Sequence, residues 1–330
     1  MTPAALLDTF PYVLLAIDGG NSKTDAVLLD ATGAFVAART GRGSGGGPGH
    51  LAEVVAELLD GLAVEPSRIT HCVAAVAGLD FPEDGPAFRA ALERTLSRAA
   101  VEVVNDALAV LDAGGGTGLA VIYGAGFNTV ARGPLGLAAH PALGWPTGEW
   151  GGGHDLGREA VRLACRSADG RGPRSRLERD VLAATGQKDH ASLARAIRDG
   201  VVTSSAVGRL TPLLLDAADA GDPAALPVVE RAVDEVAELS LLVGTRAFGA
   251  SIPAGTPAVL AGGVFRHRGW TGRIRAALAG LGFAAGRASA DPVVGVVREV
   301  AALAGVRATG VPSPRLPAPV GAAIAEKEAR

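Results

Sequence analysis

The sequence lacks most of the features that mark disulfide-rich, zinc-binding, nucleic-acid-binding or membrane-spanning proteins. Its 330 residues include only two cysteines, Cys72 and Cys165, which share no short metal-binding spacing, so neither a disulfide framework nor a zinc site is predicted. Charged residues make up 20% of the chain and the net charge is -3, so no basic surface for nucleic acid is indicated. No uncharged apolar run of about eighteen residues and no basic amphipathic stretch indicates a membrane partner.

The amino terminus also lacks the pattern of a secretory signal. Residues 1–11 include Asp8 and have no Lys or Arg, so there is no cationic flank to an apolar core, and the chain is expected to be soluble and cytoplasmic. Its length and its 48% of hydrophobic residues predict a large core, and two domains rather than one. Glycine motifs need caution, because six of the nine residues of Gly41–Gly49 are glycine and the stretch is interpreted as a surface loop.

Short apolar runs and helical periodicities follow one another in the same order in the two halves of the chain. The first half opens with three short predicted strands and continues with alternating helices and strands, at 12–17, 26–29, 35–38, 51–62, 72–77, 88–99 and 101–104. The second half again opens with three short runs that turn through glycines, and a β run and a late helix follow a helical region, at 119–123, 129–131, 135–138, 257–261 and 293–303. This repetition predicts two related α/β halves that face each other.

The segment Asp18–Thr24 is the most informative part of the sequence. A continuous apolar run ends there in Asp18-Gly19-Gly20, and a buried strand that ends in such a turn can bring backbone N–H groups, hydroxyls and one carboxylate to a phosphate. It is not a Walker A loop, because Ser22 and not glycine precedes Lys23. A plain hairpin turn has the same Asp-Gly signature, so the assignment depends on partner motifs elsewhere.

Three further turns follow predicted strands, at Asn105-Asp106, Gly124–Asn128 and Gly262-Gly263. In this order and spacing, the turns resemble the phosphate-1, connect, phosphate-2 and adenosine motifs of the sugar kinase, heat-shock-70 and actin superfamily. Within that superfamily the chain is most similar to the N-acetylglucosamine kinase family, also called the BadF/BadG/BcrA/BcrD ATPase family. Further segments carry this resemblance, which spans about Leu14 to Leu303: Asp169–Pro173, Ala218–Pro223 and Gly144–Gly153.

The resemblance implies an α/β fold with duplicated ribonuclease H-like (actin-like ATPase) domains and a cleft between them. The implied domains are residues 1–106 and residues 107–304, the second with a helical insertion over 155–248. A C-terminal helix, at about 305–330, is expected to pack back on the first domain. The implied activity is ATP-dependent phosphorylation of an amino sugar of the glucosamine or N-acetylglucosamine type, with Mg²⁺.

The implied site residues divide by role. Asp106 would accept the proton of the attacking sugar hydroxyl, although Asn105-Asp106 could also simply cap the helix that follows. Asp18 would bind Mg²⁺, usually through water. The expected phosphate-binding residues are Gly19, Gly20, Asn21, Ser22, Lys23, Thr24, Gly124, Ala125 and Gly126, and the expected adenosine-binding residues are Gly262 and Gly263. The expected sugar-binding residues are Asn105, Asp106, Gly126, Asn128 and Glu149.

The chain departs from the family pattern at its sugar motif. Glu149-Trp150 stands where the family commonly has Asp-Glu, and Phe127 stands where a serine is expected. A Phe127 that narrows the pocket and an anionic Glu149 would together favour a free amine over an acetamido group. Trp145 and Trp150 either stack on the sugar or pack in the core or hinge, and His140 and His154 are interpreted as structural.

Two other functions remain open from the sequence. The first is an ATPase that drives a partner protein by nucleotide-dependent closure, like the dehydratase activators of the family. Those activators hold an iron–sulfur cluster between subunits, and this chain has no cysteine near Gly124–Phe127. The second is a non-catalytic sugar sensor, but Asp106 is present and no DNA-binding motif precedes Asp18. The expected partner is a small-molecule sugar, and a homodimer is compatible with the sequence.

Overall fold

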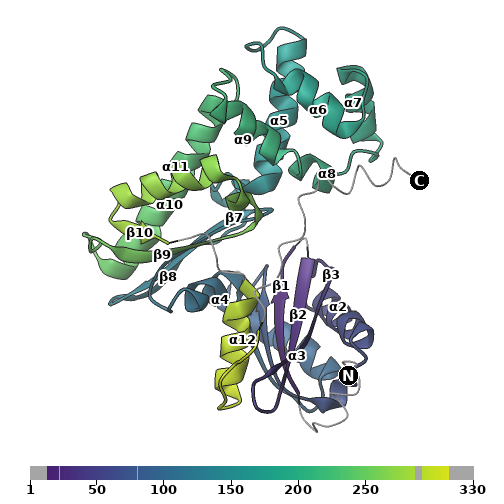
Figure 1. Cartoon of the computed structure of the whole chain (residues 1–330), viewed down its shortest axis with the longest axis vertical. Helices are drawn as coiled ribbons and strands as arrows, with labels where there is room; N and C mark the ends of the chain where they lie inside the picture. The colour runs from purple at the N-terminus through teal and green to yellow at the C-terminus, as the bar shows by residue number, and fades with distance from the viewer. Residues whose placement is uncertain (1–12, 22, 80, 287–291, 312–330) are drawn as a thin grey trace.

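The computed structural model describes residues 13–21, 23–79, 81–286 and 292–311, which form two five-stranded sheets with helices on both faces (Figure 1). The N-terminal sheet has the strand order β3-β2-β1-β4-β5. Its first three strands are antiparallel, and β4 and β5 join in parallel. The bounds of its strands are β1 Val13–Gly19, β2 Lys23–Asp30, β3 Phe35–Arg42, β4 Ile69–Val76 and β5 Ala100–Asn105.

The C-terminal sheet repeats this topology. Its order is β10-β9-β6-β7-β8, again with three antiparallel strands followed by two parallel ones. Its strands are β6 Gly118–Tyr123, β7 Phe127–Gly133, β8 Gly136–Ala139, β9 Thr256–Ala261 and β10 Phe283–Ala285. The prediction of duplicated α/β domains of the actin-like type is therefore confirmed at the level of strand order and direction.

The apolar run of β1 forms the centre of the N-terminal domain because both of its faces are covered. Leu15 and Ile17 pack with helices α2 and α3, whereas Leu14 and Ala16 pack with α12. The bounds of these helices are α2 Pro48–Gly61, α3 Gly85–Thr95 and α12 Pro292–Leu303. Short 3-10 turns, η1 Pro66–Arg68 and η2 Pro82–Asp84, precede β4 and α3.

The position of α12 corrects the domain boundary expected from the sequence. A boundary at residue 304 assigns this helix to the C-terminal domain, but Val296, Val297 and Val300 are buried against the N-terminal sheet. The chain then continues along that domain, where Ala34 forms a parallel bridge with Thr309. Residues 305–311 thus pack back on the first domain as irregular chain. The remainder of the helix expected at 305–330 lies outside the described residues.

Two helices connect the domains. Helix α4 (Asp106–Ala113) follows β5 and packs on the second sheet, where Ala107 and Val110 contact the cluster that includes Ala120 and Ala261. Helix α12 returns to the first sheet and crosses α4 closely, because a Cβ on Gly295 would lie 2.1 Å from the Ala109 carbonyl oxygen. In Figure 1 the pair α4 and α12 lies between the two sheets.

A helical region covers the C-terminal sheet and extends away from the N-terminal domain (Figure 1). The sequence analysis expected a helical insertion over 155–248, and the helices of this region run from Gly152 to Phe248. Its helices are α5 Gly152–Ala168, α6 Leu177–Thr185, α7 His190–Arg198, α8 Ser204–Gly208, α9 Thr211–Asp219 and α10 Leu226–Phe248, with η3 Trp145–Thr147 before them and η4 Gly263–Arg266 and α11 Arg268–Gly280 after β9. Among the described residues, none of the helices is long and apolar enough to cross a membrane.

Candidate functional site

The register of the N-terminal sheet brings the first turn and Asp106 to one edge. Gly19 pairs with Val76, and Val76 pairs with Asn105, so the ends of β1, β4 and β5 form one row. Neighbouring strands lie about 4.8 Å apart, which puts the backbone of Asn105 roughly 10 Å from that of Gly19. Asp106 follows directly. The turn after β1 and the carboxylate after β5 therefore face the same space.

The first turn is a tight hairpin. The Gly20 N–H donates to the Lys23 carbonyl at 2.9 Å, and β2 then returns antiparallel to β1. Asp18 is buried and pairs in register with Asp25, so their side chains lie on the same face of the sheet. The Lys23 ammonium pairs with Asp25 on that face. Ser22, the remaining predicted phosphate ligand of this turn, lies outside the described residues.

A second loop packs against this turn, which the sequence did not predict. The glycine-rich stretch before α2 was interpreted as a surface loop, but Ser44 is buried and its N–H donates to the Gly20 carbonyl at 3.0 Å. A Cβ on Gly45 would lie 2.3 Å from Asn21 Oδ1, so any larger residue here would displace the Asn21 side chain. The signal in the sequence was the run of glycines itself.

Two buried hydroxyls at the first turn have no hydrogen-bond partner among the described residues, Thr24 Oγ1 and Ser44 Oγ. A buried hydroxyl without a partner costs free energy, and such atoms are typical of sites that bind a ligand, an ion or water. They give the turn hydroxyl oxygens for a phosphate, and Asp18 adds a buried carboxylate on the opposite face of the sheet.

The helix cap at α4 is Asn105 and not Asp106. Asn105 Oδ1 accepts from the Ala107 N–H at 2.9 Å, and its Nδ2 donates to the Leu79 carbonyl at 2.8 Å. This side chain is therefore used for capping and for holding the loop after β4, which argues against its expected role as a sugar ligand. Asp106 occupies the first turn of α4 and is half-buried. The alternative that Asn105-Asp106 caps the following helix is thus borne out for Asn105, and the role of Asp106 stays a prediction.

The second turn, Gly124–Gly126, is held by the start of α5. The Gly153 and His154 N–H groups donate to the carbonyls of Gly124 and Ala125 at 2.8 and 2.9 Å. A Cβ on Gly152 would lie 2.5 Å from Gly126 Cα, and Gly152 has a positive φ of 81°. In contrast, a Cβ on Gly124 or Gly126 would meet nothing within 4 Å, so the other side of this turn is open.

Gly262 lies beside the second turn, at the end of β9. Its φ is 110°, and a Cβ there would lie 2.4 Å from the Tyr123 carbonyl oxygen. The protein backbone alone therefore requires glycine at this position, whether or not adenosine binds beside it. Around Gly263 a Cβ would meet no atom within 4 Å, so this position is open to a ligand.

Asn128 and Phe127 point to opposite faces of β7. Asn128 shares the α4 face with Val130, and its buried Oδ1 has no partner among the described residues. Phe127 packs in the core, with its ring centre 5.2 Å from that of Tyr123. The expectation that Phe127 narrows a sugar pocket is therefore wrong, because strand alternation buries this ring on the far face of the sheet.

Glu149 is held inside the protein. One carboxylate oxygen lies 3.3 Å from His140 Nδ1, and the other accepts from the Thr147 hydroxyl. The side chains of Glu149 and His140 are only 7% and 4% exposed. Burial and these two contacts hold the Glu149 carboxylate within the protein, so it is not exposed for a direct ion pair with a sugar amine. The preference for an unacetylated sugar has no support from Phe127 and stays a prediction.

The residues at the first turn fit a magnesium ion. Mg²⁺ usually binds one or two carboxylates and keeps several waters or substrate phosphate oxygens. Asp18 supplies one buried carboxylate on the face of the sheet that α12 covers, whereas Thr24, next to Asp18's register partner Asp25, points to the other face. Asp18 is therefore the residue of this turn that would hold Mg²⁺. Among the described residues, no group of three or more His, Cys, Asp or Glu residues could enclose an ion.

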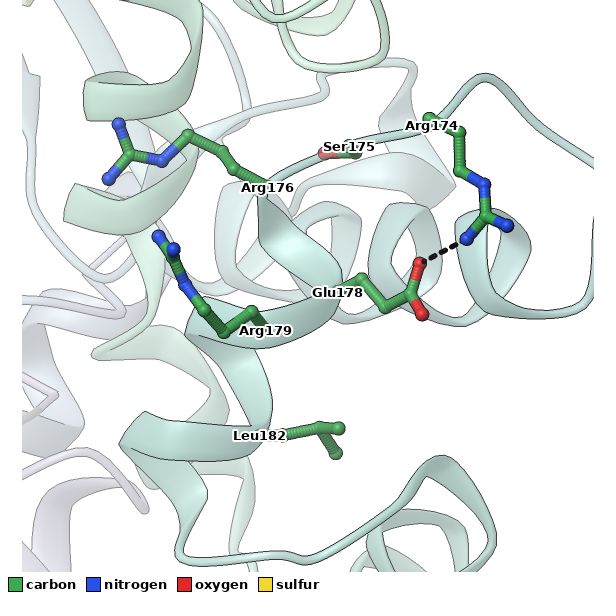
Figure 2. Close-up of a pocket in the computed structure, with 6 residues that line it drawn as sticks. All are labelled: Arg174, Ser175, Arg176, Glu178, Arg179 and Leu182. Atoms are coloured by element: carbon green, nitrogen blue, oxygen red, sulfur yellow. Dashed lines mark hydrogen bonds and ion pairs between the residues drawn. The ribbon is translucent and has the colours of Figure 1, made fainter.

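One cavity lies elsewhere, in the helical region (Figure 2). It measures about 450 Å³ and is lined by residues of α6 and the segment before it. Its arginines already have carboxylate partners: Arg174 pairs with Glu178, and Arg176 with Asp180. Next to it, buried Asp222 accepts from the Ser175 hydroxyl at 2.9 Å. The cavity thus belongs to the connection between α6 and α10, and we place the candidate site at the strand ends instead.

One known protein family matches most of the chain. A protein-family model described as the BadF/BadG/BcrA/BcrD ATPase family matches residues 15–295. The chain belongs to the BadF/BadG/BcrA/BcrD ATPase family. This confirms the resemblance found in the sequence, and membership of the family implies the use of ATP.

One curated relative and two of the similar solved structures are named as sugar kinases. The chain is 29% identical over 236 residues to an N-acetylmuramic acid/N-acetylglucosamine kinase of Clostridium acetobutylicum, covering 68% of this chain and 76% of the relative. Among solved structures, a candidate N-acetylglucosamine kinase from Porphyromonas gingivalis has a TM-score of 0.66 at 19% identity, over 89% of this chain and 100% of its own. Another from Chromobacterium violaceum has a TM-score of 0.63 at 22% identity, over 88% and 99%. The structures confirm the fold, and the predicted enzyme class agrees with all three names.

Proposed function

We propose that this chain is an ATP-dependent kinase that phosphorylates a hydroxyl of an amino sugar of the N-acetylglucosamine or glucosamine type, with Asp106 as general base. The observation that carries the proposal is the row Gly19–Val76–Asn105, which brings Asp106 to the same edge of the sheet as the first phosphate turn. The names of the relatives support the substrate class, and the family supports the nucleotide.

Each group at the strand ends has a role in this reaction. Phosphoryl transfer requires positioning and neutralisation of charge more than covalent chemistry. The amides and hydroxyls of residues 19–24 bind the β- and γ-phosphates, and the open face of Gly124–Gly126 admits them from the other domain. Mg²⁺, held through Asp18 and water, would neutralise the phosphate charge. Asp106 orients the sugar hydroxyl and accepts its proton as the hydroxyl oxygen attacks the γ-phosphorus.

The buried thiols argue against the partner-driving alternative. A cluster shared between subunits needs cysteine thiolates at the surface. Cys72 lies on β4 within the core, where burial raises the pKa of its thiol to about 12 and keeps it protonated. Cys165 is half-buried on α5, and burial raises its pKa as well. Neither cysteine lies in the second turn.

A screen of sugar acceptors tests the proposal. Purified protein with MgATP is assayed for ADP release with N-acetylglucosamine, glucosamine, N-acetylmuramic acid, glucose and glycerol, each against a reaction without acceptor. We expect sugar-dependent ADP release, with a phosphorylated amino sugar identified by mass spectrometry. ADP release that no sugar stimulates would contradict the kinase function and favour the partner-driving ATPase.

A further inference from the structure

The segment between β8 and α5 carries two tryptophans in opposite environments. Trp150 packs against the C-terminal core, and the Arg231 guanidinium carbon lies 4.1 Å from its ring centre. Its backbone N–H also binds Glu235 on α10. Trp145 is 81% exposed. Packing therefore explains Trp150, whereas the indole of Trp145 has no structural role in the described part of the chain.

A polar network holds the turn that carries Trp145. The turn is the 3-10 segment Trp145–Thr147, bounded by Gly144 and Gly148, which both have a positive φ. The Thr147 hydroxyl donates to Glu149 and also lies 3.2 Å from the Gly144 carbonyl oxygen. Glu149 in turn pairs with His140. This network fixes the turn that carries the exposed indole. Less conformational entropy is therefore lost when a ligand stacks on the ring.

Both ends of this segment lie at the candidate site. Val130 pairs with Ala139, so the next residue, His140, comes level with Thr129, the neighbour of Asn128. At the other end, the first amides of α5 bind the Gly124–Gly126 turn. Residues 140–151 therefore run between the start of β7 and the second turn, two places to which the sequence assigned sugar and phosphate ligands.

We propose that Trp145 is the stacking platform for the sugar ring, and that Thr147, Glu149 and His140 are positioning residues that hold it. The proposal rests on the proposed kinase function and adds the residue that contacts the sugar. One face of a pyranose presents C–H groups, which pack well on a planar indole. Stacking does not involve the substituent at C2, so Trp145 would contribute equally to acetylated and unacetylated sugars.

The test is steady-state kinetics with N-acetylglucosamine and glucosamine. We expect Trp145→Leu to raise the sugar KM about tenfold or more for both sugars, with the ATP KM unchanged and kcat within about threefold of wild type. Trp145→Phe should restore much of the affinity, because a smaller ring still stacks. Leu143→Ala, at an exposed apolar residue of the same loop, is the matched control and should leave the sugar KM unchanged.

The network is tested separately. Thr147→Val should raise the sugar KM by a smaller factor than Trp145→Leu, and Thr147→Ser should restore it. In titrations with N-acetylglucosamine, the tryptophan fluorescence of the wild type should change, and Trp145→Phe should lose most of that change. Because this titration needs no turnover, it tests the platform even if the acceptor screen finds no phosphorylated sugar.

Two results would overturn the proposal. A Trp145→Leu variant with an unchanged sugar KM and an active kinase would show that the indole does not bind the substrate, while leaving the kinase function intact. A Trp145→Leu variant whose mass by light scattering falls from dimer to monomer would instead assign the exposed indole to an interface between two copies of the chain.

Discussion

The two halves of the molecule share a strand order but differ in what they present at their first turn. The turn after β1 carries side chains, with buried Asp18, the exposed ammonium of Lys23 and the buried hydroxyl of Thr24. The turn after β6 is Gly124-Ala125-Gly126 and presents only backbone groups. Duplication of a fold therefore does not duplicate its chemistry, because a turn of the same topology can supply either ligands or open space.

The neighbours of the two turns explain this difference. A glycine-rich loop packs on the first turn, where Gly45 makes room for Asn21. The second turn is held by the start of α5, and the amides that a helix N-terminus could offer to an anion are already bound to Gly124 and Ala125. Substitutions at the first turn should therefore change the side-chain groups that contact a ligand. Substitutions at the second turn should instead change the backbone conformation that a ligand meets.

The largest effect is expected at Asp106, where the chain crosses from one half to the other. Asp106→Asn should lower turnover by about a hundredfold or more, because a carboxamide cannot accept the hydroxyl proton, and should leave ATP binding nearly intact. Turnover and the ATP Kd are measured side by side. Asp60→Asn, at an exposed position on α2, is the control and should have wild-type values. Equal losses of ATP affinity and rate would make Asp106 a phosphate-site or folding residue.

The second turn should be sensitive to side-chain volume added at Gly152, which packs against it. Gly152→Ala combines a positive φ with a Cβ against Gly126, so it should cost about 2–4 kcal/mol of folding free energy and raise the ATP KM about tenfold. Denaturant unfolding and kinetics give the two values. Gly272→Ala on α11, where a Cβ meets nothing, should be neutral or stabilising. An unchanged ATP KM in a destabilised Gly152→Ala would show that the second turn does not bind phosphate.

Two threonines give a direct comparison of the halves. Thr24 and Thr129 are both buried with an unpartnered hydroxyl, one in β2 and the other in β7. We expect Thr24→Val to weaken MgATP binding roughly fivefold, because it removes a charge-assisted hydrogen bond, and Thr129→Val to change it less than twofold. Isothermal titration measures both. Equal losses would show that the second half also binds the nucleotide through a side chain.

The sequence predicted the elements and the turns more completely than the directions of the side chains. Apolar runs that end in glycine locate the ends of β1, β6 and β9 without any tertiary information. The face on which Phe127 lies depends on strand register, where a shift of one residue reverses the result. The sequence indicated a helix cap at Asn105-Asp106 but did not assign it to one of the two residues, because Asn and Asp cap equally well and stand side by side.

Long-range contacts could not be predicted from the sequence either, because they depend on how distant segments pack. The periodicity of the late helix at 293–303 shows that it has an apolar face, but it does not show which of two similar sheets covers that face. The pair of His140 and Glu149 forms only because the intervening loop turns back on itself. Neither contact corresponds to a residue spacing in the sequence from which it could be predicted.

The smallest expected effect is a pH-dependent change in folding free energy at the contact between α4 and α12, which join the two halves. Glu299 on α12 is close to Asp112 on α4, Glu102 on β5 and Arg132 on β7, and burial together with the two carboxylates raises its pKa from 4.5 to about 7 despite the arginine. The folded protein therefore holds a proton here that the unfolded chain releases near pH 4.5. The stabilisation is complete below that pH and is lost as the pH rises through 7.

Glu299→Gln keeps a neutral hydrogen-bonding side chain at this position and removes the titration. Relative to wild type, the variant should gain about 1 kcal/mol of folding free energy at pH 8, a value reduced for partial exposure of the group, and close to nothing at pH 5. Thermal unfolding at the two pH values measures the difference, with exposed Glu93→Gln on α3 as the control. Because Arg132 already pairs with Asp112, Glu299 is the excess charge of the cluster. A gain of equal size at both pH values would show that Glu299 keeps its charge in the fold, and that the junction between the halves does not respond to pH.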